Sequence, residues 1–177
     1  MTALVDFVQR HPFRAVLDAN TMARLNELLS AAQAAILVAD DLEVASVCHK
    51  VGTFFYAKGE HDTAIEYDRK AEAIRLAKLG ADHPDLAATY NNLATSFLEK
   101  GEYDTAIEYH RKAEAITLAK LGADHPDLAA TYNNLATSFL EKGEYDTAIE
   151  YHRKAEAITL AKLGADHPDL ATTYSNL

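Results

Sequence analysis

Residues 79–109 read LGADHPDLAATYNNLATSFLEKGEYDTAIEY, and the same 31 residues return in the same order at positions 121–151. The sequence therefore repeats with a period of 42 residues. Over a whole period, residues 90–131 and 132–173 differ at a single position. A fixed period of this length is typical of repeat proteins, in which every repeat is one supersecondary unit.

Each repeat is predicted to form two helices, as the last complete repeat illustrates. The first helix spans residues 126–142, where apolar residues follow the spacing of one helical face. These residues are Leu128, Tyr132, Leu135, Ala136 and Phe139. The second helix spans residues 145–163, and its Ala148 and Ala155 are small enough to let a neighbouring helix approach closely. Gly143 is predicted to lie in the short turn between the two helices.

The tetrapeptide Asp-His-Pro-Asp begins the first helix of the repeat. Asp124 or His125 is expected to cap this helix, and Pro126 fits its first turn, where a missing N–H costs nothing. Asp127 complements the positive end of the helix dipole. The same positive end disfavours a cation, so capping is preferred over a metal site built from these side chains.

One such hairpin cannot bury its apolar face alone, so the repeats are expected to stack into an all-α solenoid of antiparallel helix pairs. We assign residues 1–40 to N-terminal capping helices, with a dimerising helix as the alternative. Residues 41–165 are predicted to form three repeats, and residues 166–177 the truncated first helix of a fourth.

The bulk composition limits the classes of partner. The net charge is −10 and no segment is basic, so neither nucleic acid nor an anionic membrane surface is expected to bind. The longest apolar run, residues 34–39, is far shorter than the roughly 18 residues of a membrane span. Cys48 is the only cysteine, which fits a reducing, cytoplasmic location, and we expect it to be buried and inert.

Residues 79–109 closely resemble the 42-residue tetratricopeptide repeats of kinesin light chains. The matching features are LG-x-DHPD, the NNLA tetrapeptide, the G-x-Y turn and the Ala-Ile that follows, and the resemblance extends over residues 41–177. It implies a right-handed superhelix whose concave groove binds an extended peptide. No Gly-rich phosphate-binding loop accompanies the repeats, and neither an enzymatic activity nor a cofactor is expected.

In the kinesin light chain family, residues of the first helix face the groove, and an Asn there binds the peptide backbone. A carboxamide both donates and accepts, so it pairs with the main chain of any peptide sequence. The matching residues are Asn91 and Asn92 in the second repeat and Asn133 and Asn134 in the third, and Thr95, Leu98, Thr137 and Leu140 should line the same face. The first repeat departs from this pattern, with His49 and Lys50 in place of the Asn pair and Thr53 further along.

The family often has an Arg after the Ile of the second helix, where it meets acidic residues of the ligand. Arg75 matches this position in the first repeat, whereas Thr117 and Thr159 stand there in the second and third. The resemblance therefore implies a contact with acidic peptides at the first repeat only.

His110 and His152 occupy positions where such repeats usually have a large apolar residue. Either the two side chains are partly buried and paired, or the helix is rotated relative to the family. If buried, they should be neutral, because burial disfavours the charged form. Acidification below about pH 6 should then loosen the stack of helices.

The function predicted from these features is a scaffold that binds a peptide or a partner protein in the concave groove. One alternative is a self-assembling element, because near-identical repeats have identical surfaces and an open C-terminal end could receive another molecule to form a homo-oligomer. Another alternative is a fragment of a larger adaptor or signalling protein.

Overall fold

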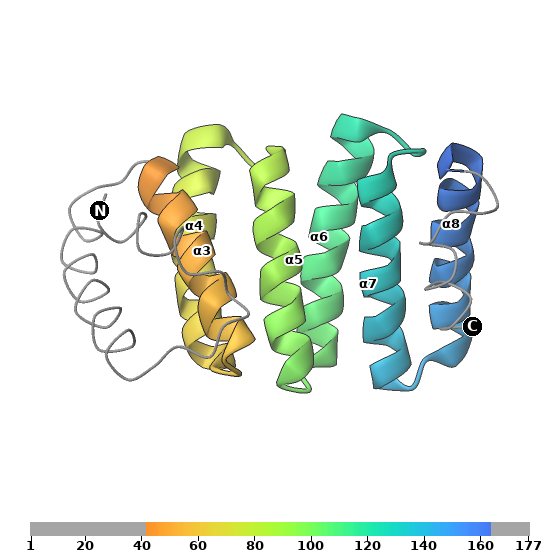
Figure 1. The fold of residues 1–177 in the computed structure, drawn as a ribbon, viewed down its shortest axis with the longest axis horizontal. Coiled ribbons are helices and arrows are strands. Elements are labelled where there is room, and N and C mark those ends of the chain that lie inside the picture. Colours follow the sequence, from red (N-terminus) through yellow and green to blue (C-terminus); the bar gives the residue numbers. More distant parts are fainter. Residues whose placement is uncertain (1–41, 164–177) are drawn as a thin grey trace. The chain divides into compact units, whose positions relative to one another are not determined.

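The structure, a computed structural model, describes residues 42–163, and the chain divides into two units, Met1–Gly80 and Ala81–Leu177. Between residues 42 and 163 the regular elements are all α-helices. The first unit contains α3 (Leu42–Ala57) and α4 (His61–Leu79), and the second contains α5 (Pro84–Glu99), α6 (Tyr103–Leu121), α7 (Pro126–Lys142) and α8 (Tyr145–Leu163) (Figure 1). These three successive helix pairs are the first, second and third repeats.

The predicted all-α class of repeated helix pairs is confirmed, and so are the predicted bounds of both helices of the third repeat. The capping helices predicted over residues 1–40 and the truncated repeat predicted over residues 166–177 lie outside the described residues.

Histidine rings cap the first helices of the second and third repeats. Nδ1 of His83 accepts a hydrogen bond from the backbone N–H of Asp85, and Nδ1 of His125 accepts one from Asp127, both at 3.2 Å. Each contact satisfies one of the N–H groups that a helix N-terminus leaves without an intrahelical partner. Between the two residues that the sequence offered, the cap of α7 is thus His125 rather than the preceding Asp.

A glycine in the left-handed region makes the turn within the third repeat. Gly143 has φ of 87°, a conformation that side chains with a Cβ rarely adopt. Its N–H donates to the carbonyl of Leu140 at 2.9 Å, and the next N–H, of Glu144, donates to Phe139 at 2.8 Å. The chain therefore reverses directly between α7 and α8, which makes the two helices antiparallel neighbours.

Each repeat contains the same three-layer stack of side chains between its two helices. In the first repeat the rings of Phe55 and Tyr67 stack with centroids 5.9 Å apart, and Nζ of Lys70 lies 4.8 Å from the Tyr67 centroid. The corresponding residues are Phe97, Tyr109 and Lys112 in the second repeat and Phe139, Tyr151 and Lys154 in the third. A lysine over a ring keeps its charge exposed while its stem covers apolar surface.

The core of the second unit is continuous across its helices, because α6 packs against both α5 and α7, and α7 packs against α8. One cluster consists of Ile107, Leu135, Phe139 and Ala148, and a second of Leu128, Ala129, Ala155 and Ile158. Ala148 and Ala155 are 2% and 0% exposed, which confirms that these small residues lie at a close helix contact. The contact between α6 and α7, which belong to successive repeats, buries helix faces that a single hairpin would leave exposed to water.

Candidate peptide-binding surface

The predicted groove residues of the second unit lie along matching faces of α5 and α7, two helices that contact each other. Asn91, Thr95 and Leu98 recur at helical spacing on α5 and are half-buried. Their counterparts on α7 are Asn133, Thr137 and Leu140. Leu140 is 41% exposed, and the adjacent Asn92 and Asn134 are half-buried.

The threonines of this surface direct their hydroxyl protons to their own helices. Thr95 donates to the carbonyl of Asn91 at 2.8 Å, and Thr137 donates to that of Asn133 at 3.0 Å. This is a common way for a threonine within a helix to satisfy its hydroxyl group. The two threonine hydroxyl protons are therefore already used within α5 and α7.

Asn91 and Asn133 are each held by a buried histidine of the second helix in the same repeat. Nδ1 of His110 lies 3.1 Å from Oδ1 of Asn91, and Nδ1 of His152 lies 3.1 Å from Oδ1 of Asn133. Both histidines are 1% exposed, so the reading that they are buried and paired is confirmed.

The second ring nitrogen indicates where the histidine proton lies. Nε2 of His152 is buried without a hydrogen-bond partner among the described residues. Unpaired N–H groups are rarer in protein interiors than unpaired acceptors, so the proton belongs on Nδ1, from which it is donated to Asn133. In the second repeat the direction follows from the acceptor, because Oδ1 of Asn91 can only accept a hydrogen bond and Nδ1 of His110 must therefore donate it. Each asparagine accepts from its histidine through the oxygen, which leaves the Nδ2 amino group to donate elsewhere.

Burial keeps both histidines neutral. It lowers the pKa of His110 from its ordinary value of 6.5 to about 4, and it lowers the pKa of His152 as well. The physical cause is desolvation, which raises the free energy of the imidazolium form relative to neutral imidazole. At neutral pH the histidines therefore act as fixed hydrogen-bond donors and carry no charge.

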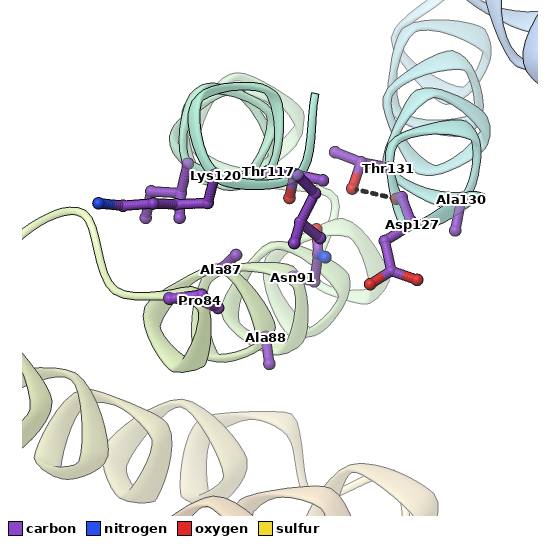
Figure 2. A pocket seen from close by; sticks show the side chains of 11 residues that line it. Pro84, Ala87, Ala88, Asn91, Thr117, Lys120, Asp127, Ala130 and Thr131 are labelled. Atoms are coloured by element: carbon purple, nitrogen blue, oxygen red, sulfur yellow. Dashed lines mark hydrogen bonds between the residues drawn. The ribbon is translucent and has the colours of Figure 1, made fainter. Parts of the chain in front are cut away.

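A pocket of about 220 Å³ opens beside Asn91, between α5, α6 and the start of α7 (Figure 2). Its lining residues are Pro84, Ala87, Ala88 and Asn91 of α5, Ile116, Thr117, Lys120 and Leu121 of α6, and Asp127, Ala130 and Thr131 of α7. The walls are mainly apolar, and two exposed side chains of opposite charge, Lys120 and Asp127, lie among them.

Of the predicted groove residues, only Asn91 lines this pocket. Sequence reasoning missed the contribution of the next repeat, which supplies Asp127, Ala130 and Thr131. The available signal was the period itself. A solenoid places the start of one first helix beside the end of the preceding second helix, where Thr117 and Lys120 lie.

The first repeat has a different polar pair at the same place. Nδ1 of His49 on α3 lies 3.2 Å from Oδ1 of Asp68 on α4, and the Asp68 side chain is 1% exposed. Lys50 and Thr53 are half-buried, and the Thr53 hydroxyl donates to the carbonyl of His49 at 3.0 Å. Arg75 is only 7% exposed, so most of the side chain that the family resemblance directs toward acidic ligands is buried.

Other chemistry-bearing groups are few in residues 42–163. In this part of the chain no three His, Cys, Asp or Glu side chains gather in a way that could hold a metal ion. Cys48 is fully buried, as predicted, and burial raises the pKa of its thiol to about 11. None of the described helices is both long enough and apolar enough to cross a membrane.

Stacked helix pairs with a repeated polar face define a helical-repeat protein of the solenoid class. The sequence profile of the tetratricopeptide repeat matches residues 43–119, 114–161 and 127–177, and the chain therefore belongs to the tetratricopeptide repeat family. Repeats of this family generally mediate protein–protein interactions, and scaffolds built from them are typically non-enzymatic.

Solved structures share the fold at low sequence identity. Nearly identical TPR-like repeats from a Podosopora anserina protein described as a kinesin light chain superpose with a TM-score of 0.73 at 23% identity, over 99% of this chain and 83% of that one. BtubC (BKLC) from P. vanneervenii gives 0.72 at 21% identity, over 99% and 79%. MamA gives 0.60 at 20%, over 93% and 89%. Comparison with curated proteins gives no match.

Proposed function

We propose that this chain is a scaffold that binds an extended peptide segment of a partner protein along α5 and α7. The observation that carries the proposal is the pair of carboxamides of Asn91 and Asn133, each held through its oxygen by a buried histidine. The two amino groups repeat 42 residues apart in sequence and offer the same donor twice. Main-chain carbonyls of an extended peptide are acceptors that suit such donors whatever the peptide sequence.

The pocket beside Asn91 adds a place for one ligand side chain. Its walls are mainly apolar, and Lys120 and Asp127 offset each other in charge. An uncharged side chain of modest size therefore fits this pocket better than an acidic or basic one. In the proposed complex, carbonyl contacts supply affinity that is independent of sequence, and the pocket supplies a preference for one apolar residue.

The test begins with peptides selected from a random displayed library on the wild-type protein. The dissociation constant of a selected peptide is then measured by fluorescence anisotropy for Asn91→Ala, Asn133→Ala and the double variant. Loss of one hydrogen bond should weaken binding by about tenfold, and loss of both by about a hundredfold. Circular dichroism checks that the variants remain folded.

The matched controls are Glu108→Ala and Glu150→Ala, which change exposed residues of α6 and α8 in the same two repeats. These changes should leave the dissociation constant within about threefold of wild type, which is well below one lost hydrogen bond. A library that yields no binder, or a peptide that responds to the glutamates and not to the asparagines, would contradict the proposal.

A second candidate function is end-to-end association with another copy of the chain, and the outer side of α8 favours it. Ile107 of α6 is buried in a cluster with Leu135 of α7, whereas its counterpart Ile149 on α8 is half-buried. Tyr145 is 63% exposed, whereas its counterpart Tyr103 is half-buried. Another copy carries first helices of the same sequence as α7, so it is a suitable occupant of this surface.

Sedimentation velocity over a wide range of protein concentration tests this association. The sedimentation coefficient should rise with concentration for the wild type and stay constant for Tyr145→Lys/Ile149→Lys, because lysines would have to be buried at the contact. A wild-type coefficient that is independent of concentration would rule out the second candidate and leave the peptide-binding proposal untouched.

A further inference from the structure

Three of the eleven positions at which residues 48–89 differ from residues 90–131 lie together between the two helices of the hairpin. The first repeat has His49, Gly52 and Asp68. The second has Asn91, Ala94 and His110, and the third has Asn133, Ala136 and His152. The first two members of each set lie on the first helix of the hairpin, and the third member lies on the second helix and is 1% exposed.

Sterics link the glycine of the first set to its aspartate. A Cβ atom placed on Gly52 would lie 2.8 Å from Cγ and Oδ2 of Asp68 and 2.9 Å from Oδ1. Real Cβ atoms essentially never come this close to another heavy atom. The carboxylate also contacts His49 from inside the hairpin, so it cannot turn out to solvent without losing this pairing.

The sets of the second and third repeats fill the corresponding space with different groups. Ala94 and Ala136 are both 0% exposed, so the space opposite their methyl groups is filled. The histidine of α6 or α8 reaches the asparagine of the same hairpin at 3.1 Å, a distance close to the 3.2 Å between His49 and Asp68. In both kinds of set, one atom of the buried polar group on the second helix is therefore paired with a partner on the first.

A first helix of one kind combined with a second helix of the other kind fails either in packing or in the pairing of the buried polar group. A first helix with Asn and Ala opposite Asp68 would press a methyl group into the carboxylate and replace the histidine partner of a buried charge with a neutral amide. A first helix with His and Gly opposite His110 would leave a methyl-sized space and set one imidazole against another. Mismatch between helices is therefore unfavourable in both directions.

We propose that these three positions are a matching code that lets α3 pair with α4 and not with a second helix of the α6 or α8 kind. The second and third repeats have identical sequences over residues 90–129 and 132–171, so their helices are interchangeable. The first repeat alone carries the other code. It thereby distinguishes the first hairpin from the two that follow it in sequence and sets the register in which the hairpins form.

Unfolding of full-chain variants by urea tests the code through a double-mutant cycle of Gly52→Ala and Asp68→His. Gly52→Ala alone should lower the folded-to-unfolded ratio by about tenfold, the effect typical of overpacking. The same change made together with Asp68→His should have a much smaller effect. The complete conversion His49→Asn/Gly52→Ala/Asp68→His should recover to within about threefold of the wild type, since the chain already contains this set twice.

The matched control is Ala94→Gly in the second repeat, which removes a methyl group at the corresponding position. Ala94→Gly alone should lower the free energy of unfolding. The addition of Asp68→His should not restore it, because the two residues belong to different hairpins. Equal effects of Gly52→Ala with and without Asp68→His would overturn the code. If the single variant does not fold, recovery of the fold in the complete conversion supports the code, and continued failure contradicts it.

Refolding provides the readout that distinguishes register from stability. Wild type diluted from urea should give fewer species by size-exclusion chromatography than the complete conversion, because only its second and third hairpins can exchange helices. The complete conversion should match its stability and yet give additional species, because all three hairpins then accept one another's helices. A complete conversion that refolds to a single species would show that the three positions match the helices without setting the register, and would overturn that part of the proposal.

Discussion

In the first repeat, His49 of α3 contacts the buried carboxylate of Asp68 on α4, whereas in the second repeat Asn91 of α5 contacts the buried imidazole of His110 on α6. The distances between the paired atoms are 3.2 and 3.1 Å. The apolar framework is nevertheless alike, since each hairpin carries the same stack of Phe, Tyr and Lys. The polar groups between two helices can thus be exchanged when both helices change together.

The two kinds of hairpin also differ in charge. The first buries Asp68 and Arg75, which are 1% and 7% exposed, where the second buries the neutral His110 and Thr117. Removal of the partner of a buried charge destabilises the fold, and so does protonation of a buried neutral histidine, because each leaves an uncompensated charge in the interior. The first repeat is therefore expected to be sensitive to substitution of its partners, and the second and third repeats to acid.

Acid should produce the largest effect. The pKa of His110 is about 4 in the folded chain and 6.5 ordinarily, so the unfolded chain binds more protons below about pH 6.5. The stability that His110 contributes is complete above that pH and is lost progressively down to about pH 4, by about 3 kcal/mol. His110→Phe/His152→Phe should flatten this decline in the free energy of unfolding, measured in urea at several pH values.

The control for the acid experiment is His83→Asn, which removes a histidine at the surface end of α5 and retains a capping residue. This variant should keep the acid decline of the wild type. A double Phe variant whose stability falls with acid as steeply as that of the wild type would show that carboxylates, and not the paired histidines, control the acid response.

Reactivity of the Cys48 thiol should show the next largest effect. Burial raises its pKa from 9.0 to about 11, so at any pH below 9 the thiolate fraction is about a hundredfold lower than for an ordinary thiol. The rate of alkylation by iodoacetamide should be lower by at least this factor in the folded chain than in urea. Asp68→Asn should accelerate the reaction, because the Asp68 charge is one of the causes that raise this pKa. Equal rates in folded and unfolded chains would contradict the burial of Cys48.

The smallest effects should come from a surface position that all repeats share. Leu76, Leu118 and Leu160 occupy equivalent places and are 45%, 43% and 46% exposed. Replacing any one of them by Gln should change the free energy of unfolding by less than about 0.5 kcal/mol, and by the same amount in each repeat. A larger loss at one of the three would mean that the repeats differ on their surfaces as well as in their interiors.

Much of the fold could be predicted because its signals are local. The bounds of α7 and α8, a cap at Asp124 or His125 and the glycine turn at Gly143 all depend on contacts between residues a few positions apart, and the structure decided for His125. The periodicity extended these predictions from one repeat to the next. The burial of Cys48 also followed from residue type alone, since free cysteines are usually buried.

The candidate site could be predicted only in part. The family resemblance indicated Asn91, and the pocket does include it, but the walls that α6 and α7 contribute required the packing of three helices. The pairing of Asn91 with His110 left one signal in the sequence, the joint change of positions 49 and 68 between the first and second repeats. That signal indicates a contact, and it does not by itself give the atoms involved.

The sequence by itself determined the helix pairs, their period and their ends, because backbone hydrogen bonds, caps and turns act within one or two helical turns. Only the tertiary structure decided which polar side chains meet, since Asn91 and His110 lie 19 residues apart on different helices. The half-buried amide of Asn91 beside the pocket and the neutral histidine behind it are consequences of that packing. Burial and hydrogen-bond geometry depend on groups that converge from several helices, which no local pattern specifies.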